Sequence, residues 1–116
     1  MKKLENYKVI FHLNEEEKAS TVFSNINNLL ADLGEDNVDI ELLMNGDGVK
    51  AILKSGKYGS RVYDLSDRGV TFKICSHSLK DRDIVKNDIF EVAEIVPSGV
   101  GELVKKQSDG WVYIRP

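Results

Sequence analysis

In the segment Gly69-Val70-Thr71-Phe72-Lys73-Ile74-Cys75-Ser76-His77-Ser78-Leu79, a strand pattern runs directly into the start of a helix. Apolar Val70, Phe72 and Ile74 alternate with polar residues, and this period of two is typical of a β-strand. The alternation stops at a cluster of Ser and His residues. Cys75, the single cysteine of the chain, therefore lies at the carboxyl end of a predicted strand.

Cys75 is expected to face the N–H groups of a new helical turn. Ser78 is followed three residues later by Asp81, a capping-box pattern that predicts a helix start. A cysteine near a helix N-terminus or a protonated histidine, such as His77, has its pKa lowered from about 8.5, which makes it nucleophilic at neutral pH. The alternative is that Cys75 is a small buried hydrophobic residue.

Further strands and helices are predicted on both sides of this segment. Strand patterns occupy residues 7–13, 38–44, 94–96 and 111–114. Helices are expected from a cap formed by Asn14 and Glu17 to the stop at Gly34, and around residues 49–53, 62–65 and 99–106. Strands separated by helices need crossovers, so we expect one α/β domain over residues 1–116, with a five-stranded, mostly parallel sheet covered by helices on both faces.

The C-terminal part is predicted to pack as a helix followed by a last strand. Val100, Leu103 and Val104 are expected to point inward from the helix. On the strand, Trp111 and Tyr113 share one face. They are expected either to pack under a helix or, if they face solvent in the monomer, to form an aromatic patch at a subunit interface.

In a parallel sheet of this kind, ligands bind outside the carboxyl ends of the strands. The residues expected at this edge come from four loops and form a candidate pocket: His12, Asn45, Gly46, Asp47, Gly48, Cys75, Ser76, His77, Ser98, Gly99, Val100 and Gly101. The N–H groups of residues 98–101 suit a small anion at a helix start. Alternatively, these glycines only relieve steric crowding in the turn.

Other chemistries have little support in the sequence. His12, Asp47, Cys75 and His77 are residue types that bind zinc, but they lack the local spacing of a zinc site. His12 is better explained as a hydrogen-bonded histidine at the end of a core strand. The carboxylates of residues 15–17 repel a phosphate where a flavin or nucleotide would bind, and the sequence has no P-loop or dinucleotide fingerprint. We therefore expect neither a metal nor a cofactor.

Composition limits the partners and the compartment. The 116 residues suffice for one core, and the formal charge of −3 disfavours binding to nucleic acids and to anionic membranes. No apolar run approaches the roughly 20 residues of a membrane span, and Met1-Lys2-Lys3 is not followed by a signal core. We expect a cytoplasmic protein. A single cysteine excludes an internal disulfide, so redox chemistry needs a thiol on another molecule.

The sequence resembles the DsrE/DsrF-like family, also called the YchN-like group, and in particular its small single-domain members. The resemblance lies in residues 7–12, 69–79, 98–107 and 110–114. It implies a three-layer α/β/α sandwich and a homo-oligomer, a trimer or a hexamer. In sulfur-transferring members, a cysteine after the third strand carries a persulfide between other sulfur carriers, and Cys75 matches that position.

Two functions follow from these observations. The first is a sulfur carrier or sulfurtransferase, in which Cys75 takes a sulfane sulfur from a donor protein and passes it to an acceptor. His77 would orient or polarise the sulfur, and the glycine turns would shape the pocket. The second is a non-catalytic oligomeric module that binds a small anion or a protein partner at the same edge, with Cys75 buried and unreactive.

Overall fold

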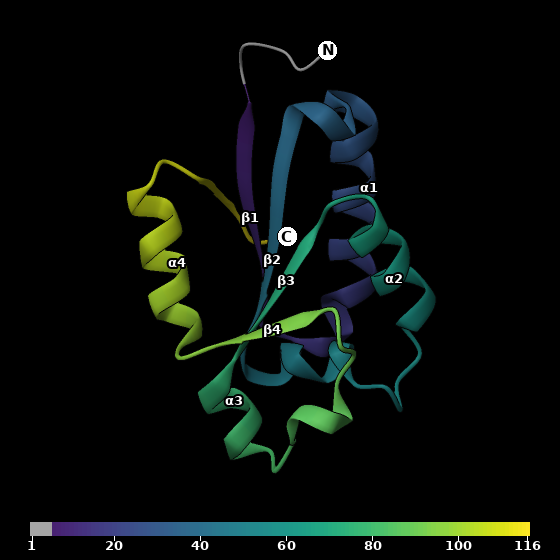
Figure 1. The fold of residues 1–116 in the computed structure, drawn as a ribbon, viewed down its shortest axis with the longest axis vertical. Helices are drawn as coiled ribbons and strands as arrows, with labels where there is room; N and C mark the ends of the chain where they lie inside the picture. The colour runs from purple at the N-terminus through teal and green to yellow at the C-terminus, as the bar shows by residue number, and fades with distance from the viewer. Residues whose placement is uncertain (1–5) are drawn as a thin grey trace.

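A computed structural model describes residues 6–116 as one sheet with helices on both faces (Figure 1). The sheet has the order β4-β3-β2-β1-β5, and every pair of neighbouring strands is parallel. The strands are β1 (Tyr7–Leu13), β2 (Val38–Met44), β3 (Thr71–Cys75), β4 (Ala93–Val96) and β5 (Val112–Ile114). The predicted strands are therefore confirmed to within about a residue at each end.

The helices form the two outer layers of a three-layer α/β/α sandwich, as predicted. α1 (Ala19–Leu33) and α2 (Gly59–Asp67) cover one face, and α4 (Gly99–Ser108) covers the other (Figure 1). The short α3 (Ser76–Asp81) lies at the carboxyl edge of the sheet, and two further 3-10 segments, Gly46–Ile52 and Lys86–Asp88, complete that end. No helix within residues 6–116 is both long and apolar enough to cross a membrane.

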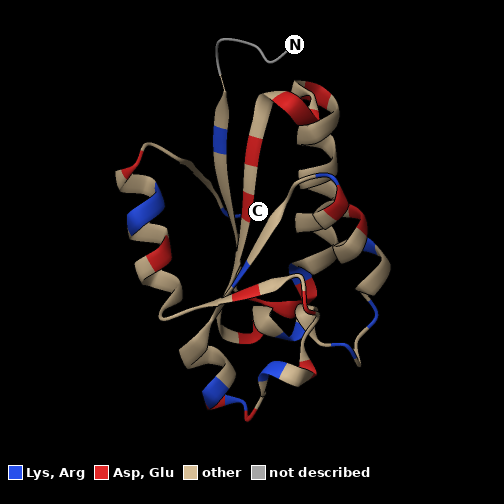
Figure 2. Ribbon diagram, in the orientation of Figure 1, with Lys and Arg blue, Asp and Glu red and all other residues tan. Residues whose placement is uncertain are grey.

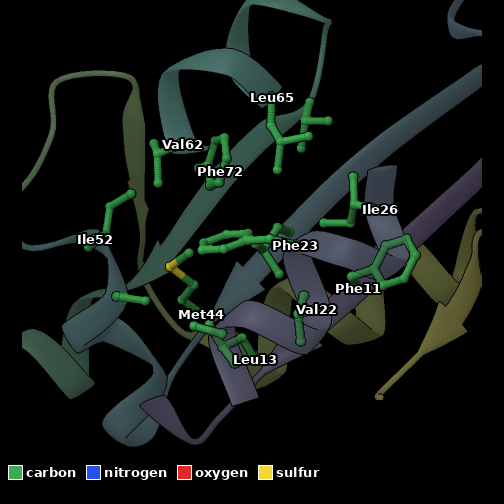
Figure 3. Close-up of a cluster of buried hydrophobic side chains, with 14 of the residues drawn as sticks. Phe11, Leu13, Val22, Phe23, Ile26, Met44, Ile52, Val62, Leu65 and Phe72 are labelled. Carbon is green, nitrogen blue, oxygen red and sulfur yellow. The ribbon is translucent and has the colours of Figure 1, made fainter. Parts of the chain in front are cut away.

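The two faces of the sheet differ in character. The main core lies under α1 and α2, where Phe11, Phe23 and Phe72 gather with aliphatic side chains (Figure 3). Under α4 the buried apolar cluster has only three members, Ile10, Leu43 and Val96, with Leu103 and Trp111 packed against it. The remainder of that face is polar, so α4 is held by a mixture of apolar and charged contacts.

Helix α1 begins later than predicted. A 3-10 turn, Glu16–Lys18, precedes it, and neither segment has a side-chain cap, so the predicted cap at Asn14 is wrong. The cause is a close contact at the end of β1. The N–H of Asn45 donates to the carbonyl of Leu13 at 3.1 Å, and a Cβ at Gly48 would lie 2.1 Å from the same carbonyl oxygen. The loop after β2 thus occupies the space beside residues 13–15.

The orientation predicted for α4 is also wrong in part. Val100 and Val104 are 65% and 64% exposed, whereas Leu103 does point inward. The inward face of α4 carries Glu102 and Lys106 because the sheet beneath it is polar. Trp111 packs against α4 with the Lys106 ammonium 5.1 Å from its ring centre, which confirms that the indole lies under a helix.

A buried carboxyl group on β2 lies at the centre of this polar contact. Glu41 is 1% exposed, and Lys106 Nζ lies 3.5 Å from Glu41 Oε1 and 3.5 Å from Glu102 Oε2. Burial of Glu41, its hydrogen bond with Glu102 and the negative charge of Glu102 raise the pKa of Glu41 to about 8. Glu41 therefore holds a proton at neutral pH and donates a hydrogen bond to the ionised carboxylate of Glu102. Figure 2 shows acidic residues on β2 and both charge signs on α4.

This proton makes the stability of the fold depend on pH. Because the folded pKa of Glu41 exceeds its ordinary value of 4.5, its contribution is complete below about pH 4.5 and is lost as the pH rises through 8. Between pH 6 and 9 we expect the free energy of unfolding to fall by on the order of 2 kcal/mol in the wild type. Glu41→Gln, which donates to Glu102 at any pH, should largely remove this dependence in urea denaturation.

The exposed Glu17→Gln serves as the control for a lost carboxylate, since its side chain lies outside the polar contact. It should retain the wild-type pH dependence. An equally steep loss of stability in Glu41→Gln and the wild type would contradict a proton held on Glu41 at neutral pH.

Candidate functional site

Three of the predicted pocket residues, Asn45, Cys75 and Gly99, meet at the carboxyl edge of the sheet, where the first turn of α4 lies on the ends of β2 and β3. A Cβ at Gly99 would lie 3.1 Å from the Cβ of Asn45, 3.2 Å from the Cβ of Cys75 and 3.3 Å from Leu43 Cδ1. These distances are tighter than ordinary van der Waals contact. Gly99 therefore allows α4 to approach the cysteine closely, and steric relief is part of the role of this glycine.

Cys75 is the last residue of β3 and directly precedes α3, which begins at Ser76. The predicted helix start at Ser78 is wrong, because Ser78 lies inside the helix and has another partner. Its Oγ accepts a hydrogen bond of 2.8 Å from the N–H of Gly46, in the loop after β2. The general expectation holds, since the N–H groups of His77 and Ser78 face the sulfur.

The surroundings of Cys75 favour the thiolate. Burial of the sulfur raises its pKa, but hydrogen bonds from the hydroxyl and N–H of Ser78 and from the N–H groups of Gly99 and His77 outweigh that effect, so the pKa of Cys75 is lowered. Because Ser78 Oγ accepts from Gly46, its own proton is free for the sulfur. Cys75 is only 6% exposed, and it is therefore both buried and acidified.

The loop after β2 holds Ser78 and helix α3 in place beside the thiol. Gly46 adopts a positive φ of 53°, which orients its N–H toward Ser78. Asp47 forms an ion pair of 3.0 Å with Arg82, which also donates to the carbonyl of Ser78 at 3.1 Å. Asp47 thus fixes α3 to the loop.

His12 is confirmed as a hydrogen-bonded histidine at the end of a core strand. Its ring is bonded on both sides, to the hydroxyl of Tyr113 at 2.6 Å and to Asn45 Oδ1 at 2.7 Å. Burial lowers the pKa of His12, the Asn45 hydrogen bond opposes this, and the charge of Arg115 adds to the lowering. Tyr113 is a site residue that the sequence did not reveal, because nothing in the local pattern gives the register of β5 against β1.

The N-terminus of α4 has few free donors for an anion. Ser98 caps the helix, and its Oγ accepts from the N–H of Gly101 at 2.8 Å. The N–H of Gly99 is directed to the sulfur. Val100 lies between them with an exposed side chain. The N–H groups of Gly99 and Gly101 therefore already have acceptors, the sulfur and the capping hydroxyl, and are not available to an anion.

The remaining predicted residues lie at the outer side of the site. Ser76 is half-buried at the start of α3, and the imidazole of His77 is exposed, with no hydrogen bond to any of residues 6–116. The contribution of His77 to the sulfur is its backbone N–H. Within the same residues, no three His, Cys, Asp or Glu side chains are grouped in a way that would hold a metal ion.

The fold and site define a class: α/β proteins with a parallel sheet and a single acidified thiol at its carboxyl edge. A model of the DsrE/DsrF-like family matches residues 8–116, so the chain belongs to this family. Among curated proteins, no relative matches the sequence.

Two solved structures are similar over almost the whole chain. A protein of unknown function from Methanobacterium thermoautotrophicum, MTH1491, is 37% identical with a TM-score of 0.90, and the match covers 96% of this chain and 100% of that one. YchN from E. coli is 16% identical with a TM-score of 0.78, and the match covers 97% of this chain and 100% of that one. The second likeness shows the shared fold.

The hydroxyl of Ser78 should be the side chain that acidifies the thiol. In Ser78→Ala, the pKa of Cys75 should rise, because the thiolate loses both the hydroxyl donor and its stabilising effect on the charge. The midpoint of the pH dependence of iodoacetamide alkylation measures this shift. Ser78→Thr retains the hydroxyl and should restore the midpoint.

Ser76→Ala is the matched control, since Ser76 is in the same helical turn but its hydroxyl is not among the groups that acidify Cys75. Its midpoint should stay at the wild-type value. Equal midpoints in Ser78→Ala and the wild type, with both proteins folded by circular dichroism, would show that the serine does not act on the sulfur.

Proposed function

We propose that the protein is a carrier of sulfane sulfur that works through Cys75. The observation that supports this most is the set of hydrogen-bond donors around one buried sulfur, which lowers its pKa although burial alone would raise it. A thiolate, and not a thiol, is the nucleophile in sulfur exchange. Membership of the DsrE/DsrF-like family supports the same role, since it suggests a fold related to sulfur relay.

The proposed reaction is a pair of exchanges with no external oxidant. The Cys75 thiolate attacks the outer sulfur of a donor persulfide, forming a new S–S bond while the S–S bond of the donor breaks and the donor thiolate leaves. An acceptor thiolate then attacks the outer sulfur of the Cys75 persulfide. A new S–S bond forms on the acceptor while the S–S bond on Cys75 breaks, and the Cys75 thiolate leaves. One sulfane sulfur moves in each step, and the thiolate count is unchanged.

The lone cysteine and its burial suit such a carrier. With one cysteine, the persulfide cannot collapse into an internal disulfide. Its 6% exposure limits contact of the loaded sulfur with stray thiols. A cytoplasm that keeps thiols reduced is the proposed compartment.

Direct loading tests the proposal. After incubation with glutathione persulfide, intact mass spectrometry should show the addition of one sulfur atom to the wild type and none to Cys75→Ser, which lacks the nucleophile. Addition of excess glutathione should then remove the sulfur. No mass gain in the wild type, or equal gain in Cys75→Ser, would favour the non-catalytic binding module.

We also propose that the protein forms a homo-oligomer through the outer face of α4. Val100 and Val104 lie one helical turn apart and are both largely exposed, which is unusual for two valines on an amphipathic helix. Burial of these side chains against a second copy would cover the thinner side of the sandwich. The trimer or hexamer expected from the sequence is the assembly proposed.

A charge on this face should dissociate the assembly. We expect Val104→Asp to lower the mass measured by light scattering to that of a monomer, because a carboxylate is not tolerated in an apolar interface. Val85→Asp changes a valine of similar exposure, 61%, outside α4 and should leave the mass unchanged. A wild type that is monomeric, or equal masses for both variants, would contradict the proposed interface.

A further inference from the structure

We propose that Tyr113, His12 and Asn45 form a positioning chain that aims the Asn45 amide N–H at the outer sulfur of a persulfide on Cys75. The inference rests on the proposed function and assigns a role to three residues that do not acidify the thiolate itself. The chain runs from β5 through β1 to the loop after β2. It thus crosses three neighbouring elements and ends beside Cys75.

The first step is the hydrogen bonding of the His12 ring. Nδ1 lies 2.6 Å from the Tyr113 hydroxyl, and Nε2 lies 2.7 Å from Asn45 Oδ1, with the residue only 8% exposed. An amide oxygen accepts but never donates, so Nε2 carries the proton. Nδ1 of the neutral ring is then an acceptor, and the Tyr113 hydroxyl donates to it. Burial, which favours the neutral ring, agrees with this assignment.

The second step concerns the other half of the Asn45 amide. Since Oδ1 is held by His12, the orientation of Nδ2 is fixed on the opposite branch. Within residues 6–116, no hydrogen bond uses Nδ2. Among the described residues, the amide N–H of Asn45 is therefore a donor of fixed orientation that no protein group accepts.

The third step is proximity. The Cβ atoms of Asn45 and Cys75 lie 3.1 Å and 3.2 Å from one point, the Cβ position of Gly99. The inner sulfur already has donors in Ser78, Gly99 and His77. A persulfide adds a second sulfur about 2 Å further out, which carries the negative charge and needs a donor of its own. Asn45 is a neighbouring side chain whose amide N–H has no hydrogen-bond acceptor among residues 6–116.

The alternative role for the chain is structural, in which it only joins β5 to β1. The two roles separate by measurement. A structural role affects the stability of both the loaded and unloaded protein. A positioning role affects the equilibrium between the Cys75 persulfide and glutathione persulfide, while the alkylation profile of the unloaded thiol stays unchanged.

The first experiment measures that equilibrium by intact mass in a buffer of glutathione persulfide and glutathione. Asn45→Leu, of similar size but without a donor, should lower the equilibrium constant for loading about tenfold, as expected for the loss of a hydrogen bond to a charged group. Tyr113→Phe should lower it about threefold, because the ring and amide lose their fixed orientation. The midpoint for alkylation of Cys75 should be the wild-type one in both.

Tyr7→Phe is the matched control, since it removes a hydroxyl from a tyrosine that is 47% exposed at the far end of β1. It should load like the wild type. Equal loading of Asn45→Leu and the wild type would overturn the inference and leave the carrier function standing. A wild type that takes up no sulfur would overturn both.

The second experiment measures the tautomer of His12, and so the direction of the hydrogen bonds in the positioning chain, in the unloaded protein. The ¹⁵N shifts of the two histidines should show His12 with its proton on Nε2 in the wild type, and His77→Gln identifies which signals belong to which ring. Tyr113→Phe should give a mixture of tautomers at His12. A wild-type proton on Nδ1 would reverse the direction of the Asn45 amide and would overturn the inference whatever the sulfur chemistry.

Discussion

The close approach of α4 to the carboxyl ends of β2 and β3 is the constraint on which the site depends. It exists because residue 99 has no side chain: a Cβ there would lie within 3.3 Å of Asn45, Cys75 and Leu43. The approach brings the backbone N–H of Gly99 to the sulfur and places the first turn of α4 against Asn45. If a side chain at residue 99 pushed α4 away, the thiol would keep only the donors from α3. The effect of burial, which raises the pKa of the thiol, would then be less fully offset.

The position of α4 is set from its other end as well. The apolar cluster beneath it is small, and the buried carboxyl of Glu41 occupies much of the remaining contact with Glu102 and Lys106. A proton on Glu41 removes a repulsion that would push the helix from the sheet. The thiol at one end and the proton near the other are thus connected through a helix of ten residues. By contrast, α1 and α2 lie on a large apolar core that depends little on charge.

The sequence predicted those features that local patterns encode. Alternating residues, and in residues 7–13 a continuous run of mostly β-branched and aromatic residues, predicted the strands. Their separation by helices predicted the parallel sheet, so Cys75 could be placed at its carboxyl edge. The errors arose where tertiary contacts override a local rule. Asn14 and Ser78 both have the sequence pattern of a helix cap. The loop after β2 packs against the end of β1 beside Asn14, and the N–H of Gly46 in the same loop donates to the hydroxyl of Ser78. Tyr113 was missed because the register of β5 is determined by its pairing with β1 and not by the local sequence. The inward face of α4 was predicted wrongly because Glu41 makes the sheet beneath the helix polar.

The two interpretations of Cys75, a buried residue and a reactive one, are compatible. Desolvation alone would keep the sulfur protonated, and solvent exposure alone would leave a persulfide open to any thiol. Here the sulfur is removed from water and its solvation is replaced by fixed donors from Ser78, Gly99 and His77. Such donors need no reorganisation when charge appears on the sulfur, whereas water does. Under the proposed function, burial would protect a bound sulfur and the donors would keep the same atom nucleophilic.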